Sequence, residues 1–367
     1  ECAGDYIMAL GTIGTNQIAS EAVTVPKVTD QVLSSRNLII NGAMQVAQRG
    51  ASFSSLSASA YTCDRWQLQV AGAGRGTVTQ ESSGGPASLK DNFLRVTVAT
   101  TDSSVASSDM QVLKQVIEGN VAAFTDAGTS DAKPLTLSFY VRSSVTGTFS
   151  ATLYTNFSSP NAVSYPAEYT ISSANTWEQK TVTFPAFTTS SSLVSSGYTT
   201  GEFYQVRFAL MAGSDNTGTA NQWNSANDFA STNQTNLFAT SSATWDITGV
   251  QLEVGETATP FEHRSFGDEL SRCQRYYYKA DMTNVGSSWH PNSLASGTGY
   301  LTEKVYYPVA MRASPTGTTT ATSGSTFSGS APYMSGTSTT FANARYDVTA
   351  TSGGYASITS FILDAEL

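Results

Sequence analysis

The chain has 367 residues, and only 13% of them are charged, about half the share usual for a globular domain. It carries 28 acidic and 19 basic side chains, and this balance excludes the basic face that nucleic-acid binding requires. Polarity comes instead from 51 Ser and 49 Thr, which accompany 34 Phe and Tyr and 29 Gly. Such amounts of β-branched, aromatic and turn-forming residues predict an all-β protein and exclude a disordered chain or a coiled coil.

The three cysteines, Cys2, Cys63 and Cys273, lie far apart in the sequence and form no CxxC pair. Their number and spacing fit neither a disulfide framework nor a zinc site, so we expect buried free thiols. Such thiols fit a protein that folds in a reducing cytoplasm, and no signal-peptide pattern stands at the start of the sequence. No apolar run reaches the roughly 18 residues of a membrane span, so we expect no membrane insertion.

Residues 1–36 differ from the rest because they contain almost no aromatic side chains. Ile18, Val25 and Val32 are spaced by seven, but Pro26 interrupts any helix there and the neighbouring Val-Thr-Val run prefers extended structure. We expect an extended connector that is ordered against copies of itself or against a neighbouring protein. A flexible linker is the alternative interpretation.

Residues 37–263 contain short segments in which apolar and polar side chains alternate, separated by Ser, Gly, Asn and Asp turns. The clearest of these segments are 135–141, 147–154, 181–184, 203–210 and 245–252. About eight to ten such strands predict a two-sheet sandwich of the jelly-roll type. Only residues 110–118 show a pattern that also fits a helix.

Residues 264–367 are expected to begin with a helix of about three turns, from Ser265 to Tyr276. Ser265 can cap its first turn, acids follow there, and arginines stand in its last turn, as the helix dipole favours. The remainder is rich in Ser, Thr and Gly and includes the strand-like segments 305–311 and 356–364. We therefore predict a second, smaller β-sandwich.

The sequence contains no pattern that indicates an enzyme. Its two histidines, His263 and His290, stand in no metalloprotease or nucleophile motif, and His263 is expected to form a structural hydrogen bond. Asp64 and Arg65 look like an ion pair that braces the following tryptophan. Acids suited to glycoside cleavage are present, but sequence spacing cannot pair them across a groove. They include Glu168, Glu178, Glu202 and Asp246.

Sugar binding has a more specific requirement, because sugar CH faces stack on exposed aromatic rings while short polar side chains bind the hydroxyls. Trp223 is the best candidate, since it lies in a polar loop between Asn221 and Asn224. Trp289 is the second, and packing beneath the loop is the alternative for both. The remaining tryptophans precede alternating segments and are expected in the core: Trp66, Trp177 and Trp245.

Several segments resemble those of bacteriophage tail-fibre and related receptor-binding proteins, over roughly residues 11–367. One is Asn-Leu-Ile-Ile-Asn-Gly at 37–42, which opens a longer stretch to residue 50. The others are 61–66, 250–262, 269–277, 307–316 and 364–367. The resemblance implies a non-enzymatic virion fibre or tail-tip protein that is made in the host cytoplasm and binds a host cell-surface glycan. It also implies a homotrimer attached to other tail or baseplate proteins through residues 1–36.

The central domain is also similar to jelly-roll carbohydrate-binding modules, which open with Asn-Leu-x-x-Asn-Gly and close with an aromatic-Asp-Ile strand. Such modules hold a structural calcium between these strands. The resemblance places it here near Asn41 and Asp246, although Ala43 and Met44 replace the usual acidic residue and Phe. Two further functions stay open: a structural virion component, such as a head fibre or decoration protein, and a polysaccharide depolymerase.

Overall fold

The computed structural model describes residues 36–89, 92–155, 163–188, 199–281, 288–289, 297–323, 327–329, 333–350 and 356–367. The chain divides into two compact units, Glu1–Arg36 and Asn37–Leu367. In the first unit only Arg36 is described. The predicted connector over residues 1–36, with its seven-residue spacing and Cys2, therefore lies outside the described residues.

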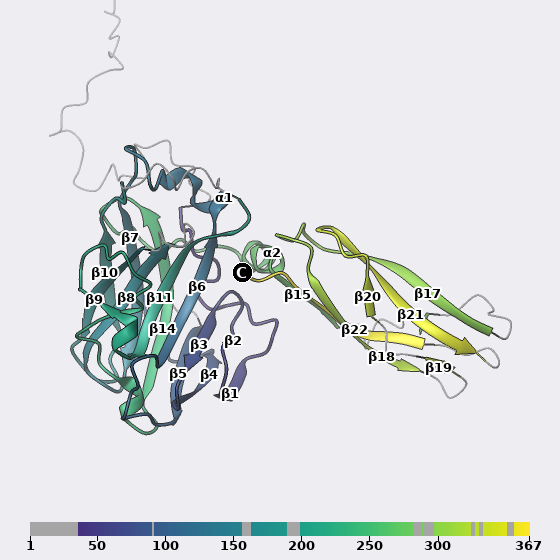
Figure 1. The fold of residues 1–367 in the computed structure, drawn as a ribbon, viewed down its shortest axis with the longest axis horizontal. Coiled ribbons are helices and arrows are strands. Elements are labelled where there is room, and N and C mark those ends of the chain that lie inside the picture. The colour runs from purple at the N-terminus through teal and green to yellow at the C-terminus, as the bar shows by residue number, and fades with distance from the viewer. Residues whose placement is uncertain are drawn as a thin grey trace, which may run out of the picture. The chain divides into compact units, whose positions relative to one another are not determined.

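Two six-stranded antiparallel sheets form the larger sandwich, and their strand order is that of a jelly roll (Figure 1). Sheet A contains, in spatial order, β1 (Ser52–Leu56), β4 (Arg75–Glu81), β5 (Phe93–Thr100), β14 (Thr244–Val254), β7 (Leu135–Ser143) and β10 (Glu178–Phe184). Sheet B contains β2 (Ala60–Tyr61), β3 (Gln67–Ala71), β6 (Met110–Glu118), β11 (Glu202–Ala212), β8 (Gly147–Thr155) and β9 (Val163–Ile171). The all-β prediction is confirmed, and each of the five clearest predicted segments lies in a strand.

Smaller elements connect these strands. Helix α1 (Gly119–Ala122) follows β6, and β12 (Thr217–Gly218) pairs with β13 (Ala230–Ser231) in the long loop after β11. The helical alternative for residues 110–118 is wrong. This segment is β6, a central strand that pairs with β3 on one side and β11 on the other, so sheet pairing decides its structure.

Rings from both sheets meet in the core between them. Phe208 of β11 lies 5.0 Å from Phe139, 5.8 Å from Trp245 and 6.2 Å from Trp66, measured between ring centroids. Trp66 and Trp245 are fully buried, which confirms their predicted place. Because successive side chains point to opposite faces of a strand, this core also determines which side chains face outward.

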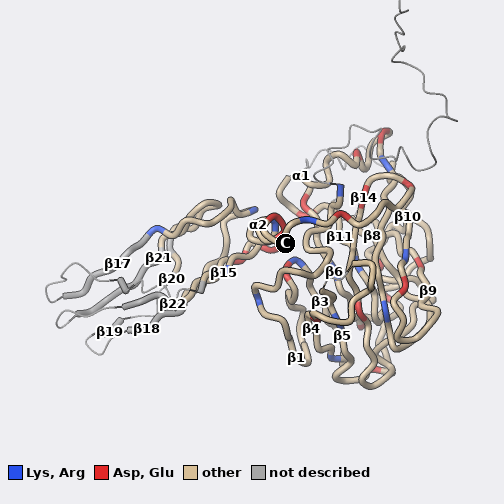
Figure 2. Tube along the Cα trace, turned by 180° about the vertical axis from the view of Figure 1, so that it is seen from behind, with Lys and Arg blue, Asp and Glu red and all other residues tan. Residues whose placement is uncertain are grey.

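Helix α2 (Phe266–Gln274) begins at the predicted N-cap, where the hydroxyl of Ser265 accepts a hydrogen bond from the backbone N–H of Asp268. Its residue Cys273 is a buried free thiol, as is Cys63, and both confirm the prediction. Charged residues are sparse along the trace and gather around α2 (Figure 2).

Two four-stranded sheets follow α2 and form the smaller β-sandwich. One contains β15 (Tyr277–Asp281), β22 (Ala356–Asp364), β16 (Ser288–Trp289) and β18 (Thr316–Ser323). The other contains β17 (Gly297–Tyr306), β21 (Phe341–Ala350), β19 (Phe327–Gly329) and β20 (Tyr333–Ser335). The predicted strand over 305–311 is wrong beyond Tyr306. Tyr307 and Met311 instead bond through their backbone N–H groups to the loop before β21.

Buried charges join the last residues of the chain to the jelly roll. The Arg65 side chain is 1% exposed and donates to the carboxylate of Glu366, whose side chain is 4% exposed. Arg65 also donates to the carbonyl of Val116 and lies over the Tyr276 ring. The predicted ion pair between Asp64 and Arg65 is wrong, because Asp64 accepts hydrogen bonds from Gln48 instead.

We expect Arg65→Leu to lower the free energy of unfolding by about 3 kcal/mol, because Glu366 would lose its main buried partner. Urea denaturation measures this. The control is Arg272→Ala, which removes an exposed ion pair with Asp268 and is expected to cost less than about 0.5 kcal/mol. Equal losses in the two variants would contradict the prediction.

Candidate functional site

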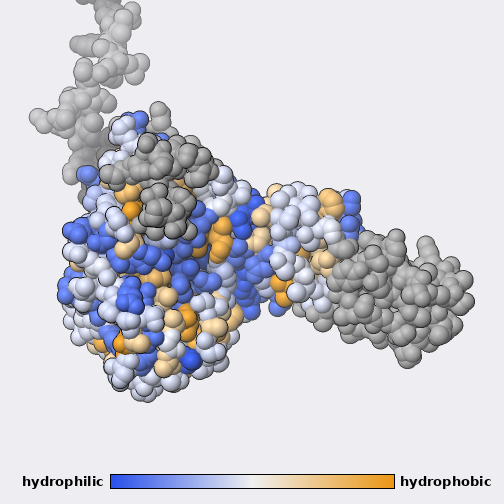
Figure 3. All heavy atoms as spheres, in the orientation of Figure 1, coloured by the Kyte–Doolittle hydropathy of each residue, from blue (hydrophilic) through white to orange (hydrophobic). Residues whose placement is uncertain are grey.

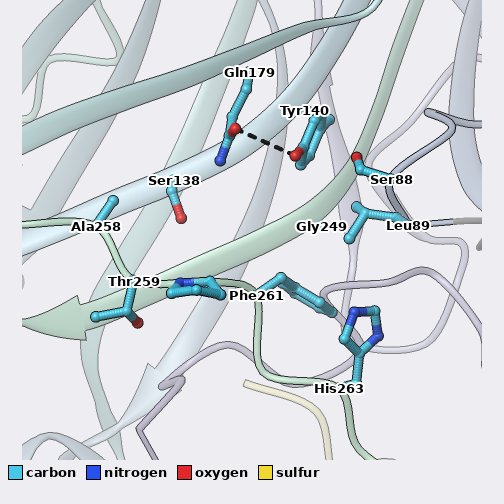
Figure 4. A pocket seen from close by; sticks show the side chains of 11 residues that line it. Ser88, Leu89, Ser138, Tyr140, Gln179, Gly249, Ala258, Thr259, Phe261 and His263 are labelled. Carbon is cyan, nitrogen blue, oxygen red and sulfur yellow. Dashed lines mark hydrogen bonds between the residues drawn. The ribbon is translucent and has the colours of Figure 1, made fainter. Parts of the chain in front are cut away.

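A pocket of about 480 Å³ lies on the outer face of sheet A, a volume within the usual range for small-molecule sites (Figure 4). We call it the outer pocket. Its lining consists of Ser88, Leu89, Ser138, Tyr140, Gln179, Gly249, Ala258, Thr259, Pro260, Phe261 and His263. These residues come from three strands, the loop before β5 and the segment after β14.

The floor of the outer pocket follows from alternation along β7. Phe139 points into the core, so Ser138 and Tyr140 lie on the outer face. Gln179 stands opposite Tyr140 in the register of β7 and β10, and the Tyr140 hydroxyl donates to its Oε1 over 3.2 Å. Figure 4 shows this pair on one side of the pocket and Phe261 on the other.

A glycine lets the loop before β5 close one end of the outer pocket. Gly249 lies at an irregularity in the pairing of β14 and has a φ of 61°, in the left-handed region. A Cβ atom there would overlap Cδ1 of Leu89 and lie 3.1 Å from Cδ2 of Tyr140. The close approach of Leu89 and Tyr140 therefore requires glycine at this position.

The opposite wall is held by hydrogen bonds from buried polar side chains of β14. The carboxylate of Glu253 accepts from the backbone N–H of Thr259 over 2.8 Å and from its hydroxyl over 2.6 Å. Gln251 donates to the carbonyl of Thr259 and accepts from the N–H of Glu262. Both β14 side chains are at most 1% exposed, so this wall is fixed before any ligand arrives.

Two rings project from this wall. The ring of Phe261 meets that of His263 edge to face, with centroids 5.1 Å apart, and His263 is exposed. The sequence predicted a structural hydrogen bond for His263 and did not indicate that it lines a pocket. Sequence reasoning also missed Tyr140 and Gln179, although the alternation of residues 135–141 is a signal that Tyr140 faces outward.

Trp223 lies away from the outer pocket and is half-buried. Its ring centroid is 5.3 Å from that of Tyr165 and 5.0 Å from that of Phe187, and its indole N–H donates to the carbonyl of Pro185. It packs against the core, as the alternative interpretation expected. A role in sugar binding stays a prediction.

The two asparagines near Trp223 fasten the same loop. The side-chain oxygen of Asn221 accepts from the N–H of Glu168, and the backbone of Asn224 pairs with Ser164 in both directions. The three predicted residues therefore share one loop over β9. Trp289 lies in β16, and its side chain is outside the described residues, as is His290.

Trp177 is not in the core, contrary to expectation. It lies half-buried on the outer face of sheet A, where its ring is 4.6 Å from the guanidinium carbon of Arg142 and 5.3 Å from the ring of Phe93. Trp177 directly precedes β10, whose first residue Glu178 pairs with Val141 of β7. Its ring therefore lies beside Arg142, outside the sandwich.

The predicted calcium ligands Asn41 and Asp246 do not fit a metal site. Asp246 is 1% exposed, and its two oxygens accept hydrogen bonds from Arg95 and Arg142 over 2.8–2.9 Å. Two guanidinium groups already balance this carboxylate and would repel a divalent cation. The side-chain oxygen of Asn41 accepts from the N–H of Val46 within its own turn. This donor set does not favour calcium, and the calcium site stays a prediction.

In the described part of the chain, no three His, Cys, Asp or Glu side chains lie together as a metal site would require. The described helices also include none with the length and apolar content of a membrane span.

No protein-family model and no curated protein matches this chain. Solved structures with some similarity include the enzymatically active domain of tailspike protein 4 of bacteriophage CBA120. The identity is 15% over 60% of this chain, with a TM-score of 0.33, and the match spans 21% of that chain, about a fifth of its length. The CBM22-2 xylan-binding domain of Paenibacillus barcinonensis Xyn10C is 12% identical over 52% of this chain and 92% of its own, with a TM-score of 0.30.

A third similar structure is the family 11 carbohydrate-binding module from Clostridium thermocellum. It is 10% identical over 58% of this chain and 99% of its own, with a TM-score of 0.28. The jelly-roll architecture of this protein follows from its own strand order.

We expect Gly249→Ala to lower the free energy of unfolding by about 1–2 kcal/mol through its left-handed backbone, and to displace Leu89 from the outer pocket. Thermal or urea unfolding measures the loss. The matched control is Gly267→Ala in α2, where the new methyl group meets open space and no loss is expected. Similar stability of both variants would refute the proposed close packing.

We expect Asp246→Asn to cost about 2 kcal/mol, because two arginines lose a buried partner but remain partly solvated. The same loss is expected in excess chelator and in about 5 mM calcium, a concentration above the dissociation constants of calcium-binding modules. A calcium-dependent rise in the wild-type Tm that disappears in the variant would restore the calcium site.

Proposed function

We propose that the jelly roll binds a host cell-surface glycan in the outer pocket, and that the protein is a bacteriophage virion fibre or tail-tip protein mediating adsorption. The observation that carries this proposal is the composition of the pocket, where aromatic rings stand beside hydroxyl and amide groups on fixed walls. The rings of Tyr140 and Phe261 offer flat apolar faces, and Ser138, Thr259 and Gln179 offer hydrogen-bonding groups.

This chemistry suits a pyranose ring better than a purely apolar ligand. Sugar CH groups gain from contact with aromatic faces, and a few placed polar groups then fix the orientation of the ring. The Nε2 group of Gln179 forms no hydrogen bond with any residue in the described ranges, while its Oε1 accepts from Tyr140. Gln179 can therefore donate to a sugar hydroxyl without breaking an existing bond.

We propose binding without cleavage. Glycoside hydrolysis requires two carboxyl groups about 5–10 Å apart, and the lining of the outer pocket includes no Asp or Glu. Glu178 lies on the neighbouring part of β10, but its carboxylate accepts from the N–H groups of Ser172 and Ser173 and pairs with Lys180.

The place of the protein in a virion is proposed from the resemblance over residues 11–367. Residues 1–36 would join three copies and attach them to other tail or baseplate proteins. Three linked copies would raise the overall affinity above that of a single pocket through effective concentration. Figure 3 shows apolar residues scattered among polar ones on the visible face of the jelly roll, which suits contact with a hydrated glycan.

We expect Gln179→Ala and Phe261→Ala each to weaken glycan binding about tenfold, the effect of losing about 1.4 kcal/mol. The test is a glycan array of host-surface oligosaccharides, followed by titration of the best ligand. Thr170→Ala is the matched control, because Thr170 is exposed on β9 of the other sheet and is expected to bind like the wild type.

The same experiment separates the alternatives. Absence of binding to every host glycan and to whole host cells would favour a structural virion component. Release of reducing ends from host polysaccharide would indicate a depolymerase and overturn the proposal of binding without cleavage.

A further inference from the structure

Two cations face each other on the outer face of sheet B, away from the outer pocket. In the register of the sheet, Gln67 of β3 stands opposite Lys114 of β6, and Lys114 stands opposite Arg207 of β11. We call these three residues the cation row. All three point outward, because Leu68, Leu113 and Phe208, which adjoin them in sequence, belong to the core.

Arg207 is held rigidly by neutral groups. Its guanidinium lies between two rings, 3.7 Å from the centroid of Tyr154 and 4.1 Å from that of Phe229. Its Nε donates to Oε1 of Gln205 over 2.8 Å, and its Nη1 donates to Oδ1 of Asn227 over 2.8 Å. With 2% of its surface exposed, Arg207 carries a nearly buried charge with no carboxylate bound to it within the described residues.

Lys114 is half-buried, and among the described residues its ammonium group has no hydrogen bond or ion pair. Like charges directly opposite each other destabilise an antiparallel pair, so this arrangement needs a compensating interaction. Two carboxylates act on these cations without an ion pair to either: Glu202 on both of them, and Asp228 on Arg207. The segments 156–162 and 189–198, which follow β8 and β10 and are outside the described residues, contain no Asp or Glu in their sequence.

The electrostatics of the two groups agree with this geometry. Burial lowers the pKa of Lys114, and the nearby Arg207 charge lowers it further. Burial also lowers the pKa of Arg207, to about 9. An anion beside the cation row would reverse both effects, because an opposite charge stabilises the protonated form.

A buried acceptor without a partner lies on the same face. Gln69 stands two residues after Gln67 on β3, and its Oε1 is buried with no hydrogen-bond partner in the described part of the chain. Buried polar atoms are normally paired, so this acceptor is open to a hydrogen bond from water or from a ligand. A sugar hydroxyl is a donor of the required kind.

We propose that the cation row binds the carboxylate of an acidic sugar unit in the host glycan, such as a uronic or sialic acid. This inference deepens the proposed glycan recognition and depends on glycan binding by the jelly roll, but not on the outer pocket. The ammonium of Lys114 contacts the carboxylate directly, and Arg207, fixed behind it, supplies a second positive charge. Gln67 and Gln69 then bind hydroxyl groups of the same sugar.

The test uses two pairs of probes that differ in charge: 3′-sialyllactose with lactose, and digalacturonate with its methyl ester. Titration of the full chain at low salt is expected to show at least one acid bound tenfold more tightly than its neutral partner. Lys114→Gln is expected to abolish this preference and to keep the fold, since it removes a repulsion. Lys180→Gln is the control, because Lys180 lies on β10 of sheet A and is paired with Glu178.

Absence of any acidic preference, or a preference that survives in Lys114→Gln, would overturn the inference. These outcomes are distinguishable from failure of the outer pocket. If Gln179→Ala weakens binding of an array glycan while Lys114→Gln changes nothing, the proposed function stands and the acidic subsite does not. If Lys114→Gln weakens binding tenfold while Gln179→Ala changes nothing, the acidic subsite stands and the outer pocket is not the binding site.

Discussion

The packing of Phe208 against Trp66, Phe139 and Trp245 joins the two sheets, and the chemistry of both outer faces depends on it. Once these rings are buried, a shift of one residue in any strand would expose its core side chains, so register is strongly specified. The same register places Tyr140 opposite Gln179 on sheet A and Lys114 opposite Arg207 on sheet B. The outer surfaces are therefore as well defined as the core.

Local pattern was enough to predict much of the fold. The strands β7, β8, β10, β11 and β14 follow from alternation, and α2 follows from its cap and charge order. The outer pocket could not be predicted in this way. Its far wall is a segment without regular structure, and hydrogen bonds from Gln251 and Glu253 to Thr259 determine where it lies. Such bonds leave no periodic signal in a sequence.

The packing of Trp223 and the ion pairs of Asp246 share one cause. A polar loop around Trp223 indicated exposure, but the ring packs on Tyr165 because the loop folds back over β9. A conspicuous Asp-Ile strand indicated a calcium ligand, but Asp246 is bound by Arg142 from the adjacent strand. In each case the deciding partner is far away in sequence, and only the sheet register brings it close.

The ion pair between Arg65 and Glu366 has a consequence for how this protein can be folded and divided. The two residues are separated by 301 positions, so this ion pair cannot form until the second sandwich has been translated. Closing so long a loop makes folding slow. A fragment cut after residue 263 would also leave Arg49 and Arg65 without their carboxylate partner. The jelly roll is thus a separate sandwich in architecture, but it depends electrostatically on residues that follow the second sandwich.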